Sequence, residues 1–126
     1  MGKFTFGKAE RLHKEKDIKE LFDKGSSFYL FPFKVLTFSA GAAGTHQVLI
    51  SVSRRNFKKA VDRNKVKRRI REAYRLQKHL LPPGPLHRIG FIYTHKEILT
   101  GKEISSKMVH ALQKISRSSG GLSKSS

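Results

Sequence analysis

Positive charge is concentrated in one stretch of this chain, from Arg54 to Arg75. It holds eleven Lys or Arg and only two acids, so half of the formal net charge of +18 falls within it. Such a density of like charge opposes compaction and favours a polyanionic partner. The fold must therefore leave this stretch on the surface. Nucleic acid is the partner we expect, and an anionic membrane surface is the competing one.

The apolar residues of this region predict a helix from about Val61 to His79. At about 100° per residue they fall on one face, which is separate from most of the charges. This face is formed by Val66, Ile70, Ala73 and Gln77, with Tyr74 at its margin. The run 80–85, Leu-Leu-Pro-Pro-Gly-Pro, should stop the helix, because proline lacks the N–H and clashes with the preceding turn.

A polar and cationic stripe, which we call the basic stripe, lies beside that face. It consists of Asn64, Lys67, Arg68, Arg71 and Arg75. Like charges at i, i+4 cost roughly a few tenths of a kcal/mol per pair. A stripe without interleaved acids therefore indicates phosphate binding rather than helix stability. We expect Lys65 and Arg69 to lie further round, away from the core. A solvated basic face and a membrane-surface helix are the alternatives, although Ala73 and Gln77 suit a lipid-facing side poorly.

The two acids and the preceding connection have separate interpretations. Asp62 supplies favourable negative charge at the helix start. We expect Glu72 off the stripe, as an ion-pair partner of Arg68 or Arg69. The connection 54–59 either reaches phosphates or forms a solvated loop, and its cations are Arg54, Arg55, Lys58 and Lys59.

The first half of the chain predicts one helix and two strands. In 15–24, Ile18, Leu21 and Phe22 share a face, and Gly25 suits a helix end with positive φ. Residues 28–39 alternate between two faces, and Pro32 should confine pairing to the residues after it or to a sheet edge. Residues 40–45 form a hairpin-type loop before a strand at 47–53, so these two strands should pair antiparallel.

The second half predicts a strand at 88–94 and a helix that begins near Thr100. Thr100 and Glu103 have the spacing of a capping box. The apolar stripe behind them is formed by Ile104, Met108, Ala111, Leu112 and Ile115. The order of elements predicts an α+β fold, a small sheet packed with helices. We divide the chain into a basic arm (1–14), one RNA-binding domain (15–117) and a disordered Ser/Gly/Lys tail (118–126).

Composition excludes several kinds of chemistry. The chain has no cysteine, which excludes disulfides, cysteine-based zinc sites and thiol catalysis. Its six His show no ligand spacing, its acids form no catalytic or metal-binding pair, and no Ser stands in a nucleophile context. No apolar run has the length of a signal peptide or a membrane span. We therefore expect a cytoplasmic protein whose own side chains perform no catalysis and hold no metal.

The order of residues in the stretch 60–75 is more informative about function than its charge alone. It reads Ala-Val-Asp-Arg-Asn-Lys-Val-Lys-Arg-Arg-Ile-Arg-Glu-Ala-Tyr-Arg, and the strand before it, 50–55, reads Ile-Ser-Val-Ser-Arg-Arg. With the first helix, in which Phe22 precedes Gly25, these segments resemble the bacterial ribonuclease P protein family. That family has a signature helix with an Arg-Asn-Arg core followed by Lys-Arg and Arg-Glu. The resemblance spans roughly Leu12 to Leu112.

The resemblance implies a fold like the second domain of ribosomal protein S5, with the signature helix in a left-handed βαβ crossover. It implies the protein subunit of an endoribonuclease that removes the 5′ leader from precursor tRNA. There, an RNA subunit with bound Mg²⁺ performs the chemistry, and the protein alone binds no cofactor. The implied partners are this RNA subunit and precursor tRNA, and no membrane.

The resemblance also implies two groups of site residues. The RNA-binding residues would be Arg54, Arg55, Lys59, Arg63, Asn64, Lys65, Lys67, Arg68, Arg71 and Arg75. The leader-binding cleft, between the first helix and the sheet, would contain Ile18, Phe22, Leu36, Ser51 and Ser53. Two positions depart from the family. Lys65 stands where the family has an arginine, so the fork of guanidinium N–H donors is absent at this position. Ile18 stands where phenylalanine is frequent, so Phe22 alone offers a full aromatic face to a base.

Two other functions stay open at this point. A structural RNA-binding module, such as a ribosomal protein, would have the same composition, and the identity of its bound RNA would distinguish it. A self-sufficient nuclease would cleave RNA without an RNA subunit, and the missing carboxylate cluster argues against it.

Overall fold

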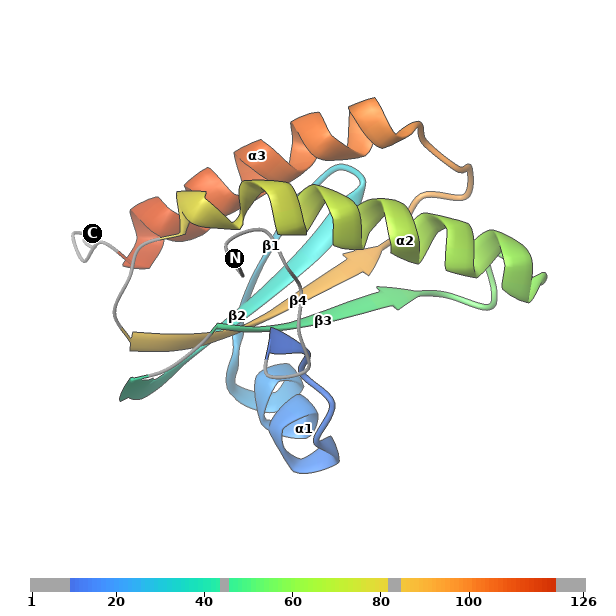
Figure 1. Ribbon diagram of the computed structural model, residues 1–126. Helices are drawn as coiled ribbons and strands as arrows, with labels where there is room; N and C mark the ends of the chain where they lie inside the picture. The colour runs from blue at the N-terminus through green and yellow to red at the C-terminus, as the bar shows by residue number, and fades with distance from the viewer. Residues whose placement is uncertain (1–9, 44–45, 82–84, 120–126) are drawn as a thin grey trace.

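A computed structural model describes residues 10–43, 46–81 and 85–119. Its helices are α1 (Glu15–Lys24), α2 (Ala60–Gln77) and α3 (Gly101–Ser119), and the 3-10 turn η2 (Lys78–Leu80) follows α2. Its strands are β1 (Ser26–Leu30), β2 (Phe33–Ala43), β3 (Gln47–Val52) and β4 (Pro85–Tyr93). The strands form one sheet, with α2 and α3 on one face and α1 on the other (Figure 1). This confirms the predicted α+β class.

The strands lie in the order β1-β2-β4-β3, so the last strand of the chain is central. β2 pairs antiparallel with β1 and β4, and β3 pairs parallel with β4, so that β3, α2 and β4 form a βαβ unit. The predicted antiparallel pairing of 28–39 with 47–53 was therefore wrong. Burial explains the order, because Ile89, Phe91 and Tyr93 of β4 are almost completely buried and a central strand is covered most fully.

The segment predicted as one strand, 28–39, contributes to two strands. A turn at Phe31 and Pro32, joined by a cis peptide, separates β1 from β2. β1 lies at the sheet edge, which agrees with the edge position expected from Pro32. The loop expected at 40–45 was placed too early, because β2 continues to Ala43. A register shift after Ser39 lets this extension pair with the start of β4.

Two apolar cores lie on the two faces of the sheet. The larger core lies between the sheet and the pair α2 and α3, and the smaller one lies beneath α1. Alternation along β2 sends Phe33 and Val35 to the larger core and Leu36 to the smaller, as the sequence predicted. Leu12, from the segment before α1, is buried in the smaller core beside Leu21.

The predicted caps can be compared with the structure at the start of α3 and at the end of α1. Thr100 and Glu103 form the predicted capping box, because each backbone N–H donates to the other side chain at 3.1 Å. Gly25 was expected at positive φ, but its φ is −72°. Glycine is needed there because a Cβ would lie 2.4 Å from the carbonyl oxygen of Leu21 and 2.9 Å from that of Thr37.

The segments at the chain ends are described only in part. α3 includes Ser118 and Ser119, the first residues of the segment predicted as a tail. Residues 120–126, residues 1–9 of the basic arm and the helix-stopping residues 82–84 lie outside the described ranges. Within those ranges, no helix combines the length and apolar character that crossing a membrane requires.

Candidate nucleic-acid interface

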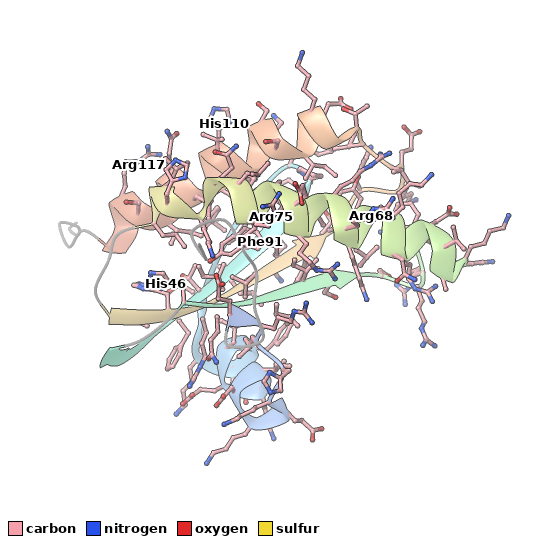
Figure 2. All side chains as sticks on the ribbon, in the orientation of Figure 1. His46, Arg68, Arg75, Phe91, His110 and Arg117 are labelled. Carbon is pink, nitrogen blue, oxygen red and sulfur yellow. The ribbon has the colours of Figure 1, made fainter. Side chains whose placement is uncertain are left out.

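The basic stripe of α2 lies beside the buried side of this helix. Arg68 is exposed and Arg75 is half-buried, and both extend from α2 (Figure 2). Of the remaining stripe residues, Asn64 is exposed, whereas Lys67 and Arg71 are half-buried. The buried face consists of Val66, Ile70, Ala73 and Tyr74. Val66, Ile70 and Ala73 are therefore buried as predicted. Tyr74, expected at the margin of this face, is fully buried, and Gln77, expected within it, is half-buried.

Lys67 and Arg71 extend the stripe toward the segment before α1. They line a hollow of about 230 Å³ together with Arg11 and His13. The segment reaches this place because Arg11 pairs with the edge strand β3 at Val48. Arg11 and His13 were predicted only as part of a basic arm, because no local pattern indicates a pairing across so many residues.

Two arginines of α2 bind the protein's own backbone. Arg63 donates from Nη1 to the carbonyl oxygens of Phe57, at 2.8 Å, and Lys58, at 3.0 Å. Arg69 donates from Nη1 to the carbonyl oxygen of Leu99 at 2.8 Å. The expectation that Arg69 points away from the core was wrong, because the segment before α3 covers that side of α2. Arg63 fixes the connection that precedes α2.

Glu72 pairs with Arg75, not with Arg68 or Arg69 as expected. The Arg75 Nε donates to Glu72 Oε1 at 3.2 Å, and its Nη2 donates to Oε2. These hydrogen bonds hold the pKa of the Glu72 carboxyl below its ordinary value and raise the pKa of Arg75. Arg75 lies three residues from Glu72, where side chains on a helix surface are neighbours, and Arg69 donates to the backbone elsewhere. The stripe is thus partly neutralised at its C-terminal end.

The connection between β3 and α2 is anchored and presents its cations outward. Phe57 is buried in the larger core, and Asn56 Nδ2 donates to the carbonyl oxygen of Thr94 at 3.2 Å. The Arg55 N–H donates to Ser53 Oγ at 3.0 Å. The exposed cations of this connection are Arg54, Arg55, Lys58 and Lys59. Lys59 directly precedes α2, so the connection leads straight into the helix that carries the basic stripe. We call the connection and the stripe the basic surface.

The residues expected in a cleft lie on the α1 side of the sheet at different depths. Phe22 is 50% exposed, Ile18 is half-buried, and Leu36 is buried beneath α1. Ser51 and Ser53 are half-buried. Leu36 therefore supports this surface from below, and Phe22 offers the most open apolar side chain of the five.

A row of side chains, the cross-sheet row, lies on the same face. Tyr29 pairs with Lys34, Lys34 with Ile92, and Ile92 with Ser51, and residues directly opposite each other share a face. Tyr29 is 63% exposed and was not predicted as a site residue. Its alternation with Phe28, which packs against the larger core, is a signal that could have placed it on the α1 side.

α1 is held on this face by contacts with β4. Arg88 Nη1 donates to Glu20 Oε1 at 2.8 Å, and its Nη2 lies 3.5 Å from Asp17 Oδ1. Leu21 packs over Gly90, where an added Cβ would lie 3.3 Å from a Leu21 methyl group. The position of α1 relative to the cross-sheet row is thus fixed.

The side chains on these surfaces offer cations, aromatic rings and few clustered acids. In the three ranges that the structure describes, no three His, Asp or Glu side chains gather as they would around a metal ion. His46 and His87 contact each other, and the His87 N–H donates to His46 Nδ1 at 3.1 Å. The basic surface suits phosphates, and the open apolar and aromatic side chains suit bases.

Comparisons with known proteins found a matching family model, related sequences and similar solved structures. The family model Ribonuclease P matches residues 6–116. A ribonuclease P protein component of Porphyromonas gingivalis is 44% identical over 81 residues, which cover 61% of this chain and 59% of the relative, less than two thirds of its length. The structure of the Staphylococcus aureus RNase P protein is 30% identical, with a TM-score of 0.71 over 86% of this chain and 95% of that one. The RNase P protein from Thermotoga maritima is 30% identical, also with a TM-score of 0.71, over 83% of this chain and 96% of that one.

Proposed function

The chain belongs to the ribonuclease P protein family, and from that premise we propose how it acts as a subunit of ribonuclease P. The basic surface of α2 and the connection before it binds the catalytic RNA subunit. The α1 side of the sheet binds the 5′ leader of precursor tRNA. The RNA subunit, with its Mg²⁺ ions, performs the hydrolysis, and the protein promotes 5′-end maturation in the cytoplasm by holding both RNAs.

The observation that carries this proposal is the placement of two different surfaces on opposite faces of one sheet. The face with α2 presents the basic stripe, which matches the dense phosphates of a folded RNA. The face with α1 presents Phe22 and the cross-sheet row, which match the unpaired bases of a leader. The edge strand β3 joins both faces, because Val48 and Val52 pack beneath α2 while Ser51 belongs to the cross-sheet row. One small domain can therefore contact two RNAs at once.

Reconstitution with the RNA subunit tests the proposal. We expect the protein to stimulate leader cleavage at low Mg²⁺, because its cations replace counterions that the RNAs otherwise require. The stimulation should fall steeply as monovalent salt rises, since each neutralised phosphate adds about 0.7–0.9 to the slope of log affinity against log salt. Cleavage that is independent of the protein at every Mg²⁺ concentration would overturn the proposal.

The identity of the bound RNA separates this function from the structural alternative. RNA recovered with the tagged protein from cells should be the ribozyme subunit and precursor tRNA. Recovery of ribosomal RNA in their place would instead establish a ribosomal role for the same basic surface. Cleavage by the protein free of RNA would establish a self-sufficient nuclease.

A further inference from the structure

Three aromatic side chains lie near the end of the sheet where β1 turns into β2. Tyr29 is 63% exposed and Phe31 is 40% exposed, although both are large aromatic residues. The ring of Phe31 lies edge-on to that of His95, with centroids 4.8 Å apart. The Tyr29 hydroxyl lies 3.5 Å from Thr94 Oγ1, next to His95 in the chain. We call Tyr29, Phe31 and His95 the aromatic corner.

Thr94 fixes this corner to its surroundings. Its N–H and its Oγ1 both donate to the carbonyl oxygen of Pro32, at 2.9 and 3.1 Å. Its own carbonyl oxygen accepts the hydrogen bond from Asn56, in the middle of the basic connection. Thr94 therefore links three segments by hydrogen bonds: the turn that carries Phe31, the segment that carries His95 and the connection that carries Arg54 and Arg55.

The corner continues the proposed leader-binding surface. β3 and β4 run parallel, with Ser51 beside Ile92 and Val52 beside Tyr93, so the next positions along the two strands are Ser53 and Thr94. The cross-sheet row also ends at Tyr29, which belongs to the corner. A single strand of RNA that follows the row therefore reaches Tyr29 first. Phe31 and His95 lie past the strand ends, where Phe31 borders α3 and His95 contacts the ring of Tyr93.

Cations flank the exposed rings. A hollow of about 290 Å³ beside Phe31 is lined by Lys102 and Lys107, together with Leu99, Glu103 and Ser106. The Glu103 carboxylate accepts two hydrogen bonds from Thr100 within the capping box. Lys34 stands opposite Tyr29 on the neighbouring strand. Exposed aromatic faces next to positive charge are the arrangement that binds single-stranded nucleic acid, because bases stack on the rings and cations attract the phosphates.

We propose that the aromatic corner is a second base-stacking site, which binds unpaired nucleotides of the precursor leader beyond those held next to α1. The identity of the ligand, the leader, rests on the proposed function. The ability of the corner to bind RNA does not, because any single-stranded RNA offers the same bases and phosphates. The corner would thus make the affinity for precursor increase with leader length.

The first experiment uses the full-length protein and a short fluorescent oligouridylate. Tyr29→Leu and Phe31→Leu keep an apolar side chain but remove the aromatic face, and each should weaken binding about tenfold, which is the loss of one stacked base. Leu76→Ala is the matched control, because Leu76 is 41% exposed on α2, outside the corner, and it should leave the affinity unchanged. Thermal midpoints should stay close to that of the unchanged protein, since Tyr29 is mostly exposed and leucine keeps an apolar side chain at both positions.

The second experiment places the same variants in the reconstituted holoenzyme with precursors whose leaders increase in length. The unchanged protein should bind long leaders more tightly than short ones, and the two corner variants should lose most of that difference. Equal affinities for variants and unchanged protein, in both experiments, would overturn the site. Weaker binding of the RNA subunit alone, with leader-length dependence intact, would overturn its assignment to the leader. If the protein fails to stimulate the ribozyme at all, the oligouridylate measurement still decides whether the corner binds RNA.

Discussion

Gly25 joins α1 to β1 within reach of two backbone carbonyl groups. An added Cβ would press on the carbonyl oxygens of Leu21 and Thr37, which belong to the last turn of α1 and to β2. Neither can move without disturbing main-chain hydrogen bonds. Gly25→Ala should therefore lower the free energy of unfolding by about 2–3 kcal/mol. The thermal midpoint, measured by calorimetry, should fall by roughly 10 °C.

Gly101→Ala is the matched control for this prediction. A Cβ at Gly101 meets nothing within 4 Å, and the residue begins α3. Alanine should be neutral there, or stabilising by up to about 1 kcal/mol, because it favours the helical conformation. If both substitutions left the midpoint unchanged, the close contacts around Gly25 would not limit stability.

Three residues show how far the role of a single side chain can be predicted from the sequence: Gly25, Arg63 and Arg69. The need for glycine after α1 was predictable from the end of the helical pattern. Its cause was not, because one of the two carbonyl groups belongs to a different strand. Arg63 and Arg69 belong by sequence to a cationic helix, and both donate to backbone carbonyls outside that helix. Which of several cations meets such a carbonyl depends on tertiary packing.

At the scale of the element, α2 combines a buried face and a basic stripe. Arg68→Glu with Arg71→Glu should reduce affinity for the RNA subunit by at least about a hundredfold, because two phosphate contacts become repulsive. The fold should persist, since neither residue belongs to the buried face. Filter binding measures the affinity for the RNA subunit, and circular dichroism shows whether the fold persists.

The control for this pair is a reversal of equal charge on α3. Lys114→Glu with Arg117→Glu changes the net charge by the same amount at two exposed positions outside the proposed surfaces. If the α3 pair weakened RNA binding as much as the α2 pair, overall charge and not the basic stripe would govern the affinity.

The helices and the faces of the strands were predictable because they depend on near neighbours. Apolar residues three and four apart identified α2 and α3, and alternation separated Phe33 from Leu36. The order of the strands was not predictable in the same way. A short loop after β2 suggested pairing with β3, whereas the more deeply buried β4 takes the place between them. Competition among distant segments for the centre of a sheet leaves no local signal.

At the scale of the molecule, the two faces of the sheet should act independently. Phe22→Ala should weaken binding of precursor tRNA about tenfold, the loss of one stacked base. It should leave the affinities for mature tRNA and for the RNA subunit unchanged, because α1 and α2 lie on opposite faces (Figure 1). Equilibrium titrations with the three RNAs provide the comparison.

A measurement of stability distinguishes the loss of a stacking side chain in Phe22→Ala from damage to the core. Phe22 is half exposed, so its truncation should cost far less than the roughly 3–5 kcal/mol expected for Phe91→Ala, which empties a fully buried site. A loss of stability comparable to that of Phe91→Ala would identify Phe22 as a core residue and remove it from the leader-binding surface.

The central place of the last strand also affects how the protein forms during translation. β1 and β2 can pair as a hairpin as soon as they leave the ribosome, but β3 has no strand partner in the sheet until residues 85–93 have emerged. Closing contacts of such long sequence separation is slow, because the entropy of the intervening loop must be lost first. A nascent chain that stops before β4 therefore carries the positive charge of α2 without a sheet to orient it. We therefore expect selective RNA binding to begin only once β4 has been inserted, so that a single strand would separate synthesis from activity in time.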